Sequence, residues 1–375
     1  MVVEIGSEIR IKNASKELNV WAQENLIIPN PQYRERERRG LWVGNTPKYL
    51  WLYRVDSSDL IVPTGVGKQV RQFLSERDQI SVQLADNDIL EYKGNIPLYD
   101  YQKTAVEAMR RTSCGILQSP CGSGKTQMGI ALAAVLKRKV LWVTHTQDLL
   151  TQSFARAEQY FPAETLGTIT DGKVRLGSHM TFATVQTLSK LDLTQYRDAW
   201  DVVIVDECHR LAGSPTQVTM FYKVMNSLAA RYKYGLSATV HRSDGMIKST
   251  FAVLGPVVYQ VPDEAVADKI MKVRICRRDT GLAINRSCLD TDGTLVYNEL
   301  LSYLGESRER NELIVKDLIS QAGHSCLVLA SRLEQLRNIR NMLPEELREV
   351  SAMIDGSMTS KRGKAEREAA IEDMR

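Results

Sequence analysis

Short apolar runs alternate with stretches of helical character through the middle of the chain. Such runs occur at residues 115–117, 140–143, 202–205 and 234–236, with polar turns and helical stretches between them. Short apolar runs bounded by turn residues are typical of buried strands, and strands that alternate with helices indicate a parallel sheet. The pattern therefore predicts an α/β domain over residues 97–262.

The residues before this domain show a different pattern. Two strand-like runs, at 49–55 and 60–62, flank a polar turn and predict a β-hairpin. Ahead of them lie apolar side chains at near-helical spacing: Leu18, Trp21, Ala22 and Leu26. The combination predicts a small α+β accessory domain over residues 1–96.

The residues after the domain predict a second, incomplete α/β lobe over 270–375. Residues 271–276 and 325–330 have the apolar character of strands, and 300–318 contains helical stretches. The last stretch, 360–375, is charged and favours a helix.

One stretch of the accessory domain combines positive charge with aromatic side chains. Residues 33–40 carry four arginines, and Trp42, Tyr49 and Trp51 follow. Cations interleaved with aromatics can hold a nucleic-acid backbone and stack its bases, so DNA contact is one interpretation. The alternative is a solvated charged loop beside a small core that holds the aromatics. We favour this alternative, because two glutamates within the stretch dilute its positive charge.

Composition adds few constraints. The chain has 375 residues and a net charge of +4, which is compatible with a polyanionic partner without indicating one. It has no signal peptide and no apolar run long enough to cross a bilayer, so we expect no membrane partner. Six cysteines show no metal-ligand spacing, and we expect free thiols in a reducing, cytoplasmic compartment.

The candidate chemistry begins with the sequence Ser119-Pro120-Cys121-Gly122-Ser123-Gly124-Lys125-Thr126. A predicted strand precedes it and an apolar helix follows, which is the setting that a phosphate-binding loop requires. Backbone N–H groups would surround phosphate oxygens, and the helix N-terminus would add partial positive charge. Lys125 would reach the β- and γ-phosphates of a nucleotide, and Thr126 would bind Mg²⁺. Ser119 replaces the first Gly of the strict pattern, and the alternative is a Gly-rich turn without a ligand.

A similar run, Gly65-Val66-Gly67-Lys68, occurs in the accessory domain. It has no Ser or Thr after the lysine, and Val62 occupies the position of the first Gly. We therefore do not assign phosphate binding to it.

Two carboxylates follow the β-branched run at 202–205. Asp206 and Glu207 would lie at the carboxyl end of a central strand, where open α/β sheets bind ligands. Beside a phosphate loop, Asp206 would hold Mg²⁺, directly or through water, and Glu207 would take a proton from the attacking water. The alternative is a solvated acidic turn. We disfavour it because the two motifs supply complementary halves of one site.

The phosphate loop, the Asp206-Glu207-Cys208-His209 sequence and the Ser237-Ala238-Thr239 turn, in this order and at these separations, resemble a superfamily 2 helicase or translocase. The likeness is closest to the branch of XPB-type enzymes and restriction-enzyme helicase subunits (ResIII), because residues 235–245 resemble the extended motif III of that branch. The resemblance covers about residues 97–260 and is looser over 270–375. It implies RecA-like P-loop NTPase domains, hydrolysis of ATP with Mg²⁺, and DNA as the partner.

The resemblance also implies roles that spacing alone does not assign. Gln102 is similar to the Q-motif glutamine that contacts adenine, although Tyr99 occupies the position of the family's usual arginine. His209, Ser237 and Thr239 would couple the state of the nucleotide to movement of the lobes. A last group would hold the backbone of one nucleic-acid strand with little sequence specificity: Thr146, Gln147, Thr184 and Gln186.

The family closes its ATP site with a second lobe that carries motifs V and VI, and neither follows Ala330 here. Motif VI supplies an arginine finger, whose effect in related nucleotidases is of order 10³–10⁵ in rate. We therefore expect a shortened product, or one half of a split enzyme whose partner chain supplies these motifs. This chain alone would then bind nucleotide and hydrolyse it slowly.

The main hypothesis is an ATP-dependent DNA helicase or double-strand DNA translocase. One alternative is a DNA-binding adaptor that uses nucleotide as a conformational ligand, without motor activity. Another is an RNA helicase, which the extended motif III disfavours.

Overall fold

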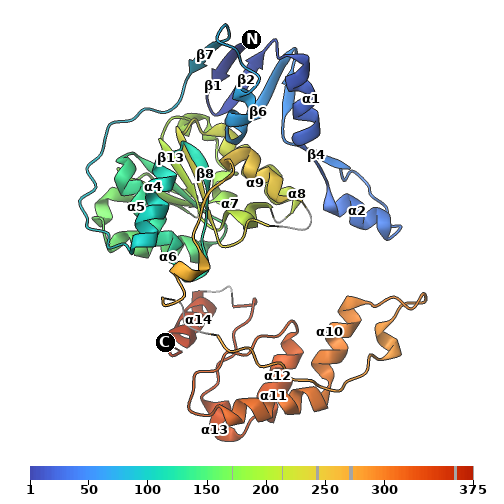
Figure 1. Ribbon diagram of the computed structural model, residues 1–375. Coiled ribbons are helices and arrows are strands. Elements are labelled where there is room, and N and C mark those ends of the chain that lie inside the picture. The colour runs from blue at the N-terminus through green and yellow to red at the C-terminus, as the bar shows by residue number, and fades with distance from the viewer. Residues whose placement is uncertain (171, 213, 242–244, 270–272, 359–360, 375) are drawn as a thin grey trace. The chain divides into compact units, whose positions relative to one another are not determined.

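The computed structural model describes the chain except for residues 171, 213, 242–244, 270–272, 359–360 and 375 (Figure 1). The chain forms two compact units, Met1–Lys272 and Val273–Arg375. Residues 242–244 belong to the segment that resembles an extended motif III, so that part of the prediction lies outside the described residues.

The first unit begins with a five-stranded sheet in the order β5-β6-β2-β1-β7 (Figure 1). Its strands are β1 (Val2–Ile5), β2 (Glu8–Lys12), β5 (Arg54–Asp56), β6 (Asp59–Pro63) and β7 (Gln79–Val82). The predicted hairpin is confirmed as β5 and β6, which pair antiparallel around a turn where Ser57 has a φ of 58°. The predicted run at 49–55 is divided, because Tyr49–Trp51 forms β4 and pairs with β3 (Ile27–Pro29) instead.

Three helices accompany this sheet: α1 (Lys16–Asn25), α2 (Pro31–Arg38) and α3 (Gly67–Arg71). The run that imitates a phosphate loop forms the start of α3 and the short 3-10 turn before it, η1 (Thr64–Val66). Gly65 packs so closely on the backbone of residues 252–255 that an added Cβ would lie 2.5 Å from the nitrogen of Gly255. This run therefore has a packing role, as its departures from the phosphate-loop pattern indicated.

The accessory module shares its core with the rest of the first unit. Leu18, Ile28 and Leu52 belong to one buried cluster with Ala212 and Val218, which follow the acidic pair in sequence. Burial of a continuous apolar surface fixes two elements relative to each other. The module is therefore packed against the segment after the acidic pair and is not a separately tethered domain.

An eight-stranded sheet forms the centre of the first unit, in the order β11-β10-β12-β9-β13-β14-β8-β15. Every neighbouring pair is parallel except β10 and β11, which confirms the predicted parallel α/β sheet. The strands are β8 (Cys114–Gln118), β9 (Val140–Thr144), β10 (Leu166–Thr170), β11 (Lys173–Arg175), β12 (Met180–Thr184), β13 (Val202–Val205), β14 (Tyr232–Ser237) and β15 (Val257–Gln260). The helices are α4 (Asp100–Arg110), α5 (Lys125–Leu136), α6 (Gln147–Glu158), α7 (Val185–Leu188), α8 (Pro215–Ser227) and α9 (Ile247–Leu254).

The central strands are apolar along their whole length because both faces of the sheet are covered. In β13, Val202 and Ile204 join the buried cluster that includes α5. Val203 and Val205 join the cluster that includes α8. Alternate residues thus enter opposite layers, and the sequence shows one continuous apolar run.

This strand order brings three segments to one edge of the sheet. β8 leads into residues 119–124, β13 leads into Asp206, and β14 lies between these two strands and ends at Ser237. Because the three strands are parallel, their carboxyl ends meet at the same edge, where such sheets bind ligands.

The second unit is helical in the part that the structure describes. Its helices are α10 (Tyr297–Glu306), α11 (Arg308–Ser320), α12 (Leu333–Met342), α13 (Glu345–Glu349) and α14 (Lys361–Glu372). A small buried cluster of Val315, Ile339 and Leu343 joins α11 to α12 and the residue that follows it.

The two strands predicted in the second unit were wrong within the described residues. Residues 273–276 and 325–330 belong to no strand, and Leu327 and Leu329 are 69% and 83% exposed. A strand needs a neighbour for its backbone hydrogen bonds. Among the described residues of this unit, the only pairing is an isolated bridge between Leu289 and Leu295.

No helix in the described ranges is both long and apolar enough to cross a membrane.

Candidate nucleotide site

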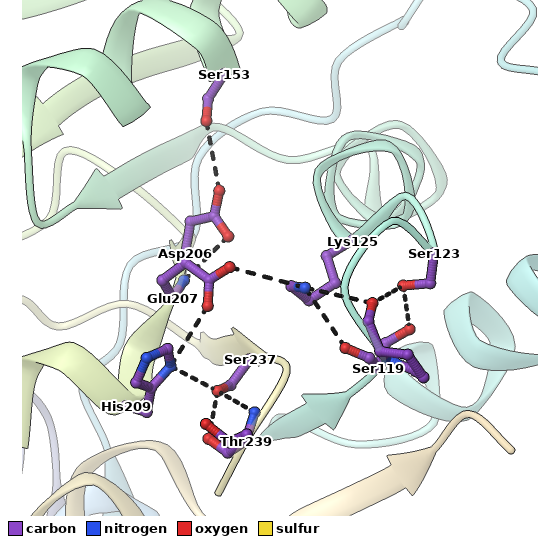
Figure 2. A network of polar contacts seen from close by, with 10 residues as sticks. Ser119, Ser123, Lys125, Ser153, Asp206, Glu207, His209, Ser237 and Thr239 are labelled. Atoms are coloured by element: carbon purple, nitrogen blue, oxygen red, sulfur yellow. Dashed lines mark hydrogen bonds and ion pairs between the residues drawn. The ribbon is translucent and has the colours of Figure 1, made fainter. Parts of the chain in front are cut away.

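The phosphate-loop sequence lies between β8 and α5, as predicted, and Figure 2 shows its contacts. Gly122 and Gly124 have φ values of 78° and 81°, in the left-handed region that favours glycine. A Cβ at Gly124 would lie 2.6 Å from Nε2 of Gln102, so this position excludes a side chain for a second reason. The turn delivers the chain directly into α5, whose first N–H groups have no partner within the helix.

The serine that replaces the first Gly has a structural explanation. Ser119 is fully buried, and its hydroxyl lies 2.5 Å from the hydroxyl of Ser123. The Ser123 hydroxyl donates to the carbonyl of Pro120 at 2.7 Å, and the Ser119 N–H donates to the carbonyl of Ser237 at 2.9 Å. The side chain of Ser119 therefore braces the loop from within.

Lys125 points into the centre of the loop (Figure 2). Its Nζ lies 3.5 Å from the carbonyl oxygens of Ser119 and Pro120 and 3.7 Å from Oε1 of Glu207. These separations exceed the usual 2.7–3.2 Å of an N–H···O hydrogen bond. The Lys125 side chain is only 9% exposed, and its ammonium group is weakly engaged by these three neighbours. Such an arrangement suits the binding of an anion at the N-terminus of α5.

Asp206 and Glu207 follow β13 and differ in their surroundings. Burial, and then the neighbouring Glu207 charge, raise the pKa of Asp206 to about 6. Its carboxylate accepts the Glu207 N–H at 3.0 Å and the Ser153 hydroxyl at 3.4 Å. Glu207 itself has a φ of 47°, which is uncommon for a residue with a Cβ and directs its side chain toward Lys125 and His209. Backbone strain of this kind concentrates at functional sites.

These residues fit a hydrated divalent cation. The raised pKa of Asp206 shows a buried carboxylate whose charge is incompletely balanced by its neighbours. Asp206 and Thr126 line one cavity of about 630 Å³, and a hydroxyl with a carboxylate is the donor set that Mg²⁺ takes beside phosphates. Asp206 and Thr126 could therefore hold Mg²⁺.

The predicted coupling residues form a connected chain of polar contacts (Figure 2). Nδ1 of His209 lies 3.4 Å from Oε2 of Glu207 and 2.9 Å from Oγ of Ser237. The Ser237 hydroxyl donates to the carbonyl of Thr239 at 2.6 Å. This bond uses the only hydroxyl proton of Ser237. The contact between His209 and Ser237 therefore needs a proton on Nδ1 of His209, which donates to Oγ of Ser237. The chain links the acidic pair on β13 to the end of β14.

Gln102 lies beside the phosphate loop, but both ends of its amide are occupied. Oε1 accepts the Tyr99 N–H at 2.9 Å, and Nε2 donates to the carbonyl of Ser123 at 2.9 Å. The Tyr101 hydroxyl donates to the same carbonyl at 2.9 Å. Gln102 thus supports the loop in this structure, and its contact with adenine stays a prediction.

Sequence reasoning missed Tyr101 and Lys269, which lie beside Tyr99 in the lining of the cavity next to the loop. The Tyr99 and Tyr101 rings are stacked at 5.8 Å, and Nζ of Lys269 lies 5.0 Å from the centre of the Tyr99 ring. No sequence motif connects Lys269 to the Q-motif region, so only the fold could reveal their proximity. Gln152 and Arg156 of α6 also line this cavity.

The predicted nucleic-acid residues lie at the carboxyl ends of β9 and β12, which are neighbours in the sheet. The Thr146 hydroxyl accepts the Leu149 N–H and begins α6, with Gln147 as its first residue. The Thr184 hydroxyl accepts the Thr187 N–H and begins α7. Nε2 of Gln186 lies 3.3 Å from Nδ1 of His145, which joins the two segments. Their nucleic-acid contacts remain a prediction.

Comparisons with known proteins show which proteins the residues of this site resemble. Residues 95–242 match the family described as "Type III restriction enzyme, res subunit" (ResIII). The chain is 31% identical over 215 residues to the "DNA 3'-5' translocase XPB2" of Sulfurisphaera tokodaii. The aligned residues cover 56% of this chain and 46% of that protein. Over residues 95–242 the chain is similar to superfamily 2 helicases of the XPB and ResIII type. The recognition made from its motifs is confirmed.

Two further comparisons extend this result. The chain is 27% identical over 253 residues to a putative ATP-dependent RNA helicase of Acanthamoeba polyphaga mimivirus, and the match covers 64% of this chain and 46% of that protein. The crystal structure of the UvsW helicase from bacteriophage T4 matches with a TM-score of 0.50 and 19% identity, covering 69% of this chain and all of that one. This likeness confirms the RecA-like fold. The chain spans about half the length of the curated relatives it matches.

Proposed function

We propose that this chain is the ATP-binding part of an ATP-dependent DNA helicase or translocase. The observation that carries the proposal is the convergence of Lys125 on the phosphate loop with Glu207 of the acidic pair, 3.7 Å apart at one sheet edge. The names of the relatives support motor activity on nucleic acid, and a DNA translocase is among them.

The residues of the site divide the work of ATP hydrolysis. The ammonium group of Lys125 and the N-terminal N–H groups of α5 would bind the β- and γ-phosphates and balance their charge. Mg²⁺, held by Thr126 and Asp206, would supply further charge neutralisation when bound. Glu207 would accept the proton of the attacking water, since its carboxylate already faces the loop.

Coupling to DNA would use the chain of polar contacts from Glu207 through His209 to Ser237. Loss of the γ-phosphate changes the charge that Glu207 faces, and His209 is within reach of both Glu207 and Ser237. Ser237 also contacts the phosphate loop, because its carbonyl accepts the Ser119 N–H. A change in the nucleotide would therefore shift the end of β14 relative to the loop.

The experiment measures phosphate release from ATP by the full chain under four conditions: without polynucleotide, with duplex DNA, with single-stranded DNA and with RNA. We expect slow release that DNA stimulates and that falls to background in Glu207→Gln, while this variant still binds ATP. ATP binding with no release above the Lys125→Ala background on any polynucleotide would contradict the motor and favour the adaptor. Stimulation by RNA in preference to DNA would favour an RNA helicase, which one relative's name supports.

A further inference from the structure

The accessory module carries an exposed projection, which we call the arm and define as residues 30–51. It comprises α2, the loop after it and β4, and Figure 1 shows α2 projecting away from the five-stranded sheet. Helix α2 has no buried residue. Trp42 is 85% exposed and Trp51 is 59% exposed. The favoured prediction, a small core that holds these aromatic side chains, is therefore wrong, because both indoles are exposed to solvent.

The arm also holds most of the chain's excess positive charge. Four arginines and Lys48 against two glutamates give residues 30–51 a net charge of +3, while the whole chain has +4. Glu35 pairs with Arg38 at 3.1 Å and with Arg39 at 2.5 Å, so one glutamate serves two cations. Glu35 therefore offsets charge at Arg38 and Arg39, while the arm as a whole keeps a net charge of +3.

The aromatic side chains of the arm have defined neighbours. The Trp42 ring lies over Gly44, where a Cβ would come within 3.0 Å of the ring. Gly44 has a φ of 53°, so a glycine suits this turn for its backbone as well. Lys48 Nζ lies 5.9 Å from the centre of the Tyr33 ring, and the Trp51 and Tyr53 rings are 5.6 Å apart. Exposed indoles and a lysine–tyrosine contact therefore lie on the same arm as the arginines.

The base of the arm is anchored firmly. Asn30 is fully buried, its Nδ2 donates to the carbonyl of Pro47 at 2.8 Å, and its Oδ1 accepts the Gln32 N–H at 3.0 Å. Just beyond β4, the carbonyl of Leu52 accepts the Tyr222 hydroxyl of α8 at 2.5 Å. The arm is thus fixed to the helix that follows the acidic pair, and its exposed aromatics are not a consequence of a loose connection.

The geometry points to the arm as a binding surface for an unpaired stretch of DNA, with arginines on the phosphates and Trp42 or Trp51 stacked on a base. Cations select a polyanion, and flat exposed indoles select free base faces, which a duplex hides in its stack. The choice of DNA as the polyanion rests on the proposed function. The choice of an unpaired strand does not depend on the proposed function, because it follows from the charge and the exposed aromatic side chains of the arm.

The test is fluorescence anisotropy of the full chain with a labelled oligodeoxythymidine, without nucleotide. We expect Trp42→Ala to weaken binding about tenfold, the loss typical of one aromatic–base stack, and Trp42→Phe to restore most of it. The double variant Arg34→Ala with Arg36→Ala should lower the slope of log affinity against log salt by about 1.4, since each phosphate contact on a single strand contributes about 0.7. Far-UV circular dichroism would check that each variant is folded.

Several results would overturn this inference. Unchanged affinity in Trp42→Ala together with an unchanged salt slope in the arginine variant would exclude the arm from nucleic-acid binding and favour a protein partner. An equal loss of duplex affinity would contradict base stacking. Failure of wild type to bind any single strand would also refute it. Lys125→Ala should bind the strand normally, so a failure of the ATP site is distinguishable from a failure of the arm.

Discussion

Replacing Asp206 by Asn should stabilise the protein and at the same time abolish its use of Mg²⁺. Burial raises the pKa of Asp206 from 3.8 to about 6. Above pH 6 the carboxyl group is ionised in both states, but its ionisation is less favourable in the folded chain, and this difference lowers the stability of the fold. A pKa difference of about 2, at about 1.4 kcal/mol for each pKa unit, corresponds to about 3 kcal/mol of folding free energy.

The sign of this effect follows from proton binding. Below about pH 4, Asp206 is protonated in both states and costs nothing. Between about pH 4 and pH 6, the unfolded chain releases this proton first, and stability is lost as pH rises. Asn carries no charge, and its amide can still accept the Glu207 N–H and donate to Ser153, the two contacts that the carboxylate makes.

The assay is thermal melting of wild type and Asp206→Asn across this pH range. We expect equal melting temperatures near pH 4 and an advantage for Asp206→Asn of up to roughly 5 °C at pH 8. Adding ATP with Mg²⁺ should raise the melting temperature of wild type and leave the variant nearly unchanged. Asp201→Asn is the matched control: Asp201 is also buried beside β13, but its two oxygens accept the N–H groups of Asn87 and Lys139, so this variant should lose stability. A variant at position 206 that melts below wild type at pH 8 would refute the reasoning.

Three further predictions concern single contacts. Gly124→Ala should reduce ATP affinity at least about tenfold in calorimetry, because left-handed backbone costs a non-glycine residue about 1–2 kcal/mol and the new Cβ meets Gln102; unchanged affinity would count against the loop geometry. Ser237→Ala should retain ATP binding but lose DNA-stimulated phosphate release, since it removes the oxygen that His209 contacts; retained stimulation would exclude this route of coupling. Tyr222→Phe should lower the free energy of unfolding in urea by about 1 kcal/mol through loss of one partly buried hydrogen bond; a stability equal to wild type would argue against the anchoring of the arm.

The arrangement of the candidate nucleotide site could be predicted because its parts are short and local in sequence. A strand, a glycine turn and a helix specify the loop around Lys125, and a β-branched strand specifies where Asp206 lies. Their meeting required only that parallel strands share an edge. Cavity residues such as Lys269 could not be predicted, because no local pattern connects them to Tyr99.

The failures have a common physical cause. An apolar run predicts a strand only if other strands are available to pair with it, and residues 325–330 have no partner strand among the described residues. Likewise, aromatic residues predict a core only if other elements cover them, and Trp42 remains exposed. Pairing and burial are properties of the tertiary fold, so local propensity could not settle either case.

The central claim is that Lys125 and Asp206 act on one magnesium-bound triphosphate. The most direct test is ATP binding by the full chain with Mg²⁺ and with a chelator, in wild type, Lys125→Ala, Asp206→Asn and the control Lys68→Ala. We predict that Lys125→Ala weakens binding in both conditions, that Asp206→Asn weakens it only with Mg²⁺, and that Lys68→Ala matches wild type. Equal effects of Asp206→Asn with and without Mg²⁺, or normal binding by Lys125→Ala, would contradict the claim.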